Sequence, residues 1–183
     1  MKFIATNLAG CFIIEPKIIE DQRGYFMESF NEKTFQNGVE QEVHFVQDNQ
    51  SFSTQGVLRG LHYQTGNHAQ AKLVRVLSGE VLDVAVDIRP DSSTFGKHVS
   101  ISLSGENQKQ FFVPRGFAHG FLVLSETATF LYKCDNFYNK ESEGGIIYSD
   151  STLNIDWQFP TENLIISEKD TVLPNLENAK KAW

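Results

Sequence analysis

The sequence predicts an all-β protein, built as an antiparallel β sandwich or barrel. Apolar and polar residues alternate with a period of two in several stretches, as strands with one buried face require. Glycine, proline, asparagine and serine interrupt these stretches at short intervals, where turns are expected. The chain of 183 residues also contains 15 phenylalanines, and aromatic side chains favour sheet over helix.

The clearest strand pattern runs through residues 72–88, with the sequence KLVRVLSGEVLDVAVDI. The apolar residues at even positions from 82 to 88 share one face, and Asp83 and Asp87 share the other. Ser78 and Gly79 divide the pattern, so we predict two strands joined by a hairpin turn.

The remaining elements are predicted from shorter patterns. Residues 98–104 alternate apolar side chains with serine, and residues 110–134 hold another pair of strands, divided at Ser-Glu-Thr. Asn31 is a suitable N-cap for a helix of about one and a half turns that stops at Gly38. The tail from residue 160 onward predicts one more short helix. Because no Pro/Gly/Ser-rich linker interrupts the chain, residues 1–183 are expected to form a single domain.

Charge and cysteine content limit the classes of partner and compartment. The net charge is −7 with a pI of about 5.2, which argues against nucleic acid, and an anionic small molecule would need a local basic cluster. Cys11 and Cys134 form no CxxC pair, so we expect reduced, buried thiols of a cytosolic protein, with a disulfide as the alternative. No stretch approaches the roughly 20 apolar residues of a membrane span, so we expect a cytoplasmic protein that does not bind membranes.

The stretch GVLRGLHYQ, residues 56–64, combines groups that a purely structural strand does not need. His62 is open to two interpretations, a core imidazole bonded to the backbone or a catalytic group. Arg59 presents a forked cation suited to phosphate, and Gly60 permits the close approach of a ligand or of another backbone. This combination favours a small-molecule site between Arg59 and His62.

Three further side chains are each open to a structural and a functional interpretation. Lys72 begins a strand, and its ammonium either extends to solvent or points inward to stabilise an oxyanion. Tyr132 alternates with core residues, so its phenol either packs there or has a chemical task. Tyr138 lies in a loop-like context, where its ring is either simply exposed or stacks on a nucleobase.

His119 follows the turn Pro114–Gly116 in a PxGxxH pattern, which is half of the metal-binding pattern of small β barrels. The other half is missing, because no HxH pair precedes it and the position four residues later is Val123. We therefore expect no metal, and His119 either caps the turn or contacts substrate.

Lys169 and Asp170 belong to a charged cluster near the C-terminus that is typical of a solvated surface. The alternative is that Asp170 contacts His62, where it would orient the imidazole and raise its basicity. The two residues are 108 positions apart, so their spacing alone does not choose between these interpretations.

Several long segments resemble the dTDP-4-dehydrorhamnose 3,5-epimerase family, in the family's order. They are QDNQSFSTQGVLRGLHYQ, AKLVRVLSGEVLDVAVDIRPDSSTFGK, VPRGFAHGFLVLSETATFLYKC and ISEKD, together with the earlier DQRGYFMESF. The resemblance implies a cupin-type jelly-roll barrel with a few short peripheral helices, which works as a homodimer without metal or organic cofactor. It also implies the epimerisation of dTDP-4-dehydro-6-deoxy-D-glucose at C3 and C5, on the route to dTDP-L-rhamnose.

The resemblance also assigns roles to individual residues. It implies that His62 is the general base with Asp170 as its partner, that Tyr132 is the proton donor, and that Lys72 and His119 contact the substrate. The remaining residues implied to bind the nucleotide sugar are Arg23, Glu28, Gln47, Asp48, Asn49, Arg59, Tyr138, Glu143 and Lys169.

The chemistry of these groups agrees with such a reaction. A 4-keto group acidifies the hydrogens on C3 and C5, so epimerisation needs a base, a stabiliser of the enolate oxygen and an acid opposite the base. Imidazole, ammonium and phenol are suitable groups for these three tasks. The rival hypotheses are an enzyme that epimerises one carbon or isomerises the keto group, a non-catalytic nucleotide-sugar binder, and a metal-dependent cupin.

Overall fold

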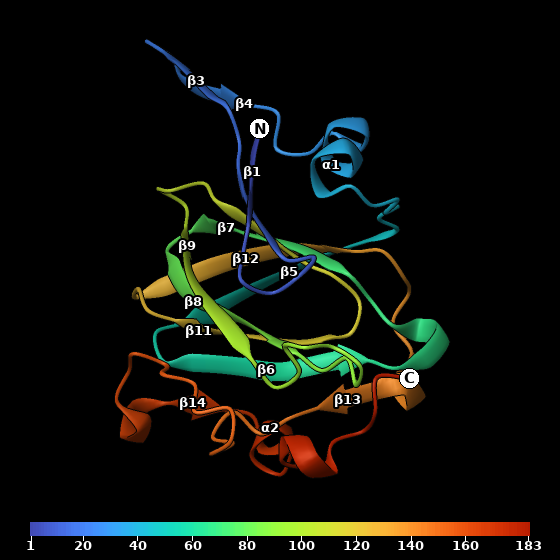
Figure 1. The fold of residues 1–183 in the computed structure, drawn as a ribbon. Coiled ribbons are helices and arrows are strands. Elements are labelled where there is room, and N and C mark those ends of the chain that lie inside the picture. Colours follow the sequence, from blue (N-terminus) through green and yellow to red (C-terminus); the bar gives the residue numbers. More distant parts are fainter.

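Two β-sheets face each other and enclose the apolar interior of the protein, in a computed structural model that describes residues 1–183 (Figure 1). The first sheet consists, in spatial order, of β1 (Lys2–Ala5), β2 (Phe12–Glu15), β10 (Gln110–Val113), β7 (Lys72–Ser78), β12 (Thr127–Cys134) and β5 (Gln47–Thr54). The second consists of β13 (Glu143–Gly145), β6 (Val57–Gln64), β11 (Phe117–Val123), β8 (Glu80–Asp87) and β9 (His98–Ser104), with β14 (Ile165–Ile166) parallel to β6. The predicted all-β, double-sheet jelly roll is confirmed.

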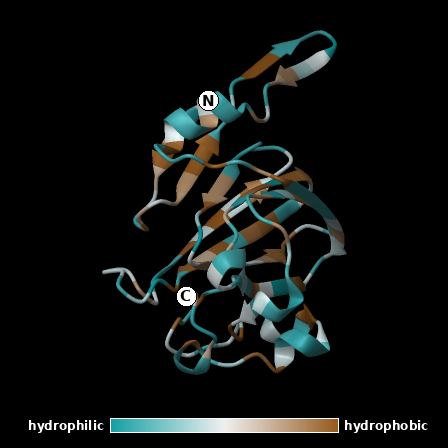
Figure 2. Ribbon diagram, turned by 90° about the vertical axis from the view of Figure 1, so that its right-hand side faces the viewer, coloured by the Kyte–Doolittle hydropathy of each residue, from teal (hydrophilic) through white to brown (hydrophobic).

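The remaining elements are short and lie outside the two sheets. They are the hairpin β3 (Ile18–Asp21) and β4 (Gly24–Met27), helices α1 (Glu32–Val39) and α2 (Glu168–Thr171), and single 3-10 turns at Gly66–His68, Lys140–Ser142, Thr161–Asn163 and Leu176–Asn178. The hairpin projects away from the sandwich (Figures 1 and 2). None of the helices is long and apolar enough to span a membrane.

The turn at Ser78 and Gly79 joins the two sheets and does not form the predicted hairpin. Strand β7 lies between β10 and β12 in one sheet, whereas β8 lies between β11 and β9 in the other. Both edges of β7 are therefore already paired, and the chain crosses over at a glycine with a positive φ of 79°. A Cβ atom at Gly79 would lie 2.0 Å from the carbonyl oxygen of Thr127, so only glycine fits this corner.

Two further details differ from the prediction. Residues 110–134 contain three strands instead of two, because β10 ends at Val113 before the turn that starts β11. Asn31 caps α1 as predicted, but the helix continues through Gly38 and ends at Val39. Gly38 serves a different purpose, because the ring of Phe3 packs so closely that a Cβ there would lie 2.3 Å from it.

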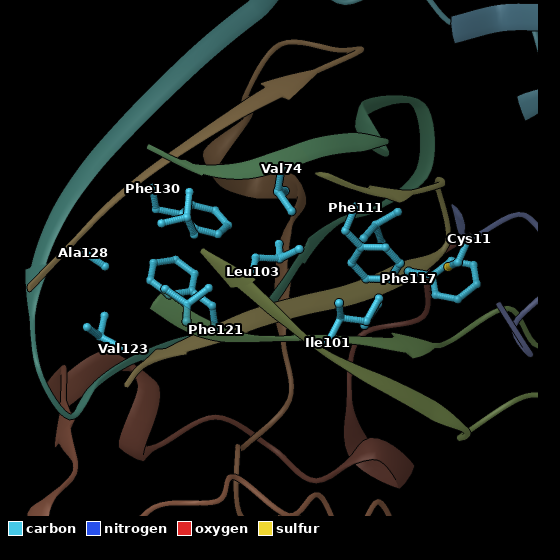
Figure 3. Packing of buried hydrophobic residues seen from close by; sticks show 14 of the residues in the cluster. Cys11, Val74, Ile101, Leu103, Phe111, Phe117, Phe121, Val123, Ala128 and Phe130 are labelled. Carbon is cyan, nitrogen blue, oxygen red and sulfur yellow. The ribbon is translucent and has the colours of Figure 1, made fainter. Parts of the chain in front are cut away.

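The core between the sheets consists of aromatic and branched side chains from inward-facing strand positions (Figure 3). Phe121 of β11 and Phe130 of β12 stack with their ring centroids 4.1 Å apart, which joins the two sheets. The same inward faces carry polar residues toward one end, and this end holds the cavity described below. Both cysteines are buried and unpaired, as predicted.

Asp87 is fully buried at the end of β8, where it binds the side chains of Arg89, Ser92 and Thr94 at 2.6 Å each. Burial raises the pKa of its carboxyl, but these hydrogen bonds outweigh burial and lower the pKa to about 2.

Replacing Asp87 by asparagine is expected to lower the free energy of unfolding by about 2 kcal/mol at neutral pH. Because the folded pKa lies below the unfolded value of about 3.9, the contribution of the carboxylate is complete above about pH 4. It is lost as the pH falls through about 2. Urea unfolding of both proteins at pH 7 and pH 3 measures the effect, and an equal difference at both pH values would contradict it.

Candidate active site

A cavity of about 680 Å³ opens between the two sheets. A second cavity, of about 360 Å³, shares Asn49, His62, Lys72 and Tyr132 with the first, so the two form one continuous site. The residues expected in the site that line one or both cavities are Gln47, Asn49, Arg59, His62, Lys72, His119, Tyr132, Tyr138, Glu143, Lys169 and Asp170. The tertiary structure therefore brings together groups from both sheets and from α2.

His62 and Asp170 form a hydrogen-bonded pair in which Nε2 lies 2.6 Å from Oδ1. Strand β14 lies parallel to β6, and this pairing carries α2, which follows directly, to the imidazole. Ser167 caps α2 by accepting a hydrogen bond from the backbone N–H of Asp170. The 108 intervening positions are thus spanned by strand pairing, and the surface-cluster interpretation of Asp170 is wrong, because it is only 3% exposed.

The charge of Asp170 determines which nitrogen of His62 is free. Burial raises the pKa of the Asp170 carboxyl, but the hydrogen bond from His62 and the backbone N–H of Gly60 outweigh burial, and the pKa falls below its ordinary value. An ionised carboxylate accepts a hydrogen bond from Nε2–H, so in the neutral imidazole Nδ1 keeps its lone pair. His62 can then act as a base through Nδ1.

Lys72 and Tyr132 come from neighbouring strands of the first sheet, in the layer opposite His62. Burial raises the pKa of the Tyr132 phenol, so it stays protonated over the neutral range. Burial lowers the pKa of the Lys72 ammonium, while nearby negative groups, including Asp83 and Glu143, act in the opposite direction. The cavity therefore has a protonated phenol and an inward-facing amine on the wall across from an imidazole.

His119 lies beside His62 in the second sheet and contacts Asp83. Its Nε2 is 2.9 and 3.0 Å from the two carboxylate oxygens of Asp83. Asp83 does not line the cavity itself but binds His119, which does, and it was not selected from the sequence, although an acid within a largely apolar strand was a usable signal. Lining residues that were not selected include Gln50, Ser51, Gly120, Phe121, Phe130, Ile165, Ile166 and Ser167.

The outer end of the site is held by a contact between two segments. Glu143 accepts a hydrogen bond from the Tyr138 hydroxyl at 3.2 Å and forms an ion pair with Lys169. Burial raises the pKa of Glu143, but the bond from Lys169 outweighs it, and the pKa falls below its ordinary value. Among the other residues of the site, Arg59 donates a hydrogen bond to Ser53 at 3.1 Å, and Gln47 donates one to Asn49 at 2.9 Å.

Three residues expected in the site do not line the cavity. Arg23 lies on the projecting hairpin, fully exposed and paired with Asp21, and Glu28 follows that hairpin. Asp48 alternates with its cavity-lining neighbours along β5, so its side chain points to the other face and binds Lys133 at 2.9 Å. No group of three or more His, Cys, Asp or Glu side chains has the arrangement of a metal site.

The family model described as dTDP-4-dehydrorhamnose 3,5-epimerase matches residues 5–178 of the chain. The chain belongs to the dTDP-4-dehydrorhamnose 3,5-epimerase family. Within this epimerase family, the chain is 56% identical over 170 residues to the enzyme of Shigella flexneri, with 93% of each chain covered.

Solved structures of this epimerase family and of a related enzyme share the fold. A dTDP-6-deoxy-D-glucose-3,5-epimerase from Legionella pneumophila, in complex with dTDP-4-keto-L-rhamnose, is 51% identical with a TM-score of 0.93, over 97% of this chain and 93% of its own. A 3'-monoepimerase from Streptomyces bikiniensis, in complex with dTDP-quinovose, is 30% identical with a TM-score of 0.87, over 94% of this chain and 86% of its own. Of these three relatives, the two named as 3,5-epimerases are more similar in sequence to this chain than the 3'-monoepimerase is.

Proposed function

We propose that the chain is a dTDP-4-dehydrorhamnose 3,5-epimerase, which converts dTDP-4-dehydro-6-deoxy-D-glucose to dTDP-4-dehydro-L-rhamnose. The observation that carries this proposal is the arrangement of the His62–Asp170 pair, Lys72 and Tyr132 around one cavity. Residues 1–183 act as a single cupin-like epimerase domain in the cytoplasm, where unpaired thiols such as Cys11 and Cys134 are stable.

The first step is removal of a proton beside the keto group. His62 Nδ1 takes the proton from C3 or C5, and the carboxylate of Asp170 stabilises the imidazolium that forms. The electrons of the broken C–H bond form a double bond between that carbon and C4, and the C4 carbonyl oxygen becomes the enolate oxygen. Lys72, whose amine faces the cavity, donates a hydrogen bond to that enolate oxygen.

The second step returns a proton to the opposite face of the same carbon. Tyr132 belongs to the first sheet and His62 to the second, so the two groups act on opposite faces of a ring held between the sheets. The phenol gives its proton to the carbon, the enolate collapses to the ketone, and solvent restores the phenol. His62 releases its proton to water, so each cycle leaves the enzyme unchanged.

The nucleotide part of the substrate occupies the outer end of the cavity. Arg59 and Lys169 supply positive charge for the diphosphate. The site can therefore bind an anionic substrate although the whole chain has a net charge of −7. Tyr138 is 55% exposed at this end, and stacking of its ring on thymine contributes about 1–3 kcal/mol. The remaining polar groups of the nucleotide sugar bind to His119, Gln47, Asn49 and Glu143.

The enzyme works as a homodimer in which the β3–β4 hairpin of one protomer reaches the cavity of its partner. The hairpin carries Tyr25 and Phe26, which are 56% and 68% exposed, a costly arrangement for an isolated chain. The outward-facing Arg75 nearby has two buried nitrogens without a partner. A second copy would cover these groups and would bring Arg23 and Glu28 to the nucleotide sugar.

Replacing Phe26 by aspartate is therefore expected to weaken the dimer and to lower activity. Light scattering should give twice the chain mass of 20.7 kDa for the wild type, and 20.7 kDa for a growing fraction of the variant on dilution. The control is Phe95→Asp, because Phe95 is also exposed, at 46%, and lies outside the hairpin. A wild-type protein that stays monomeric at micromolar concentration would contradict the dimer.

The proposed reaction is tested by incubation with the 4-keto sugar nucleotide in D₂O, followed by proton NMR. Deuterium at both C3 and C5 with the L-configured product is the expected result. Deuterium at one carbon would indicate a monoepimerase, and a 3-keto product would indicate a ketoisomerase. Tight binding of dTDP without any exchange would indicate a non-catalytic binder.

A further inference from the structure

Asp83 is a fully buried carboxylate whose only hydrogen-bond partner is His119. Its exposure is 0%, and both oxygens lie about equally far, 2.9 and 3.0 Å, from a single nitrogen. Asp87 shares its strand, face and burial, yet it binds an arginine and two hydroxyls. A buried carboxylate is costly unless positive charge lies near it, and Asp83 has no lysine or arginine at hydrogen-bond distance.

Lys72 is a source of positive charge for Asp83. The two residues lie on facing sheets with inward-pointing side chains, and Asp83 is among the groups that act electrostatically on the Lys72 ammonium. The titratable or charged groups around Lys72 are Arg59 and His62 from β6, Asp83 from β8, His119 from β11, Tyr132 and Cys134 from β12, Glu143 from β13, and Lys169 and Asp170 from α2.

Only three of these surrounding groups are carboxylates. Glu143 is bound to Lys169 and Tyr138, and Asp170 is bound to His62. Asp83 contacts only His119, so its charge is not already neutralised by a lysine or arginine. It is therefore the carboxylate most able to favour the charged form of Lys72.

The hydrogen bonds of the His119 ring also indicate a role for Asp83. Because both oxygens of Asp83 approach Nε2, that nitrogen carries the proton. Nδ1 has no hydrogen-bond partner in the protein, and His119 lines the cavity. The ring thus presents an acceptor, and a sugar hydroxyl is the donor that matches it.

We propose that Asp83 is a positioning residue of the epimerase, which keeps Lys72 cationic and holds His119 with its Nε2–H toward Asp83 and its Nδ1 toward a hydroxyl of the hexose. Asp83 touches neither the reacting carbons nor the keto oxygen, and it acts through its two neighbours. This inference rests on the proposed function.

The charge effect is tested with Asp83→Asn. Asparagine keeps a carbonyl oxygen for Nε2–H and removes only the negative charge. Lys72 then loses its proton at a lower pH, and the basic limb of the kcat/KM profile should move down by about one pH unit or more. This limb reports Lys72 because burial lowers its pKa and raises that of Tyr132. The acidic limb should stay in place, because Asp83 does not contact the His62–Asp170 pair.

The matched control is Asp87→Asn, which removes an equally buried carboxylate from the same face of β8 and should leave both limbs unchanged. Circular dichroism verifies folding, and Asp83→Ser is the second variant if asparagine is not tolerated. A basic limb that coincides with the wild type in a folded Asp83 variant would overturn the charge effect.

The orientation of His119 is tested in the wild-type protein by ¹⁵N NMR of the imidazoles, with His119→Gln used for assignment. We expect Nε2 to carry the proton that is donated to Asp83, and a ring whose Nε2 lacks that proton would overturn this part. This readout does not depend on turnover. Failure of the proposed function would instead appear as a wild-type protein that catalyses no exchange in D₂O.

Discussion

Replacing His62 by alanine is expected to lower kcat/KM by about 10³-fold and to abolish solvent exchange at both C3 and C5. The imidazole lies 2.6 Å from the buried carboxylate of Asp170, which stabilises the imidazolium that forms, whereas His119, the other imidazole that lines the cavity, is bonded to Asp83. Without His62, the cavity loses the base that Asp170 supports. Both exchanges should stop together because one base serves both carbons.

The experiment measures deuterium uptake at each carbon by proton NMR under single-turnover conditions. His98→Ala is the matched control, because His98 is also half-buried but lies on β9 outside the cavity. Its exchange rates should equal those of the wild type. Normal exchange at either carbon in His62→Ala would assign the base at that carbon to another group.

Replacing Tyr132 by phenylalanine is expected to separate proton removal from proton return. His62 still forms the enolate, but the opposite wall lacks its acid, so the proton returns from the original side and the configuration is retained. Epimerisation should fall about 10²-fold, more at C5 than at C3, while exchange of the starting sugar with solvent persists. Burial raises the pKa of this phenol, so the loss should be constant across the neutral range.

Comparison of exchange with product formation measures this effect, again in D₂O. Tyr148→Phe is the matched control, since Tyr148 is partly buried in the cluster outside the second sheet and does not line the cavity. Tyr132→Phe with wild-type product formation at both carbons would show that water or another residue returns the proton.

Local patterns in the chain predicted several elements correctly. The alternation in residues 72–88 marked β7 and β8, and Asn31 marked the start of α1. The hairpin expected at Ser78 was wrong, because both edges of β7 are paired with strands distant in sequence. Strand partners depend on which apolar faces close over a common interior, and no local propensity encodes that choice.

The candidate site likewise depends partly on local sequence and partly on the tertiary structure. His62, Lys72, Tyr132 and Asp170 were selected from their side-chain types and from the motifs around them. Their meeting was not predictable from spacing, because it depends on a parallel pairing between β14 and β6 and on two sheets facing each other. Arg23 and Glu28 were also selected, yet a single protomer keeps them away from its own cavity.

The amino-acid sequence by itself determined the strand class of the chain, which side chains share one face of a strand, and the available acids and bases, because these depend on alternation and composition. The tertiary structure alone decided that Asp170 reaches His62 and that Asp83 supports His119. Contacts between distant segments arise when the sheets pack to remove apolar surface from water. A carboxylate buried by that packing acts on its neighbours more strongly than the same carboxylate in solvent.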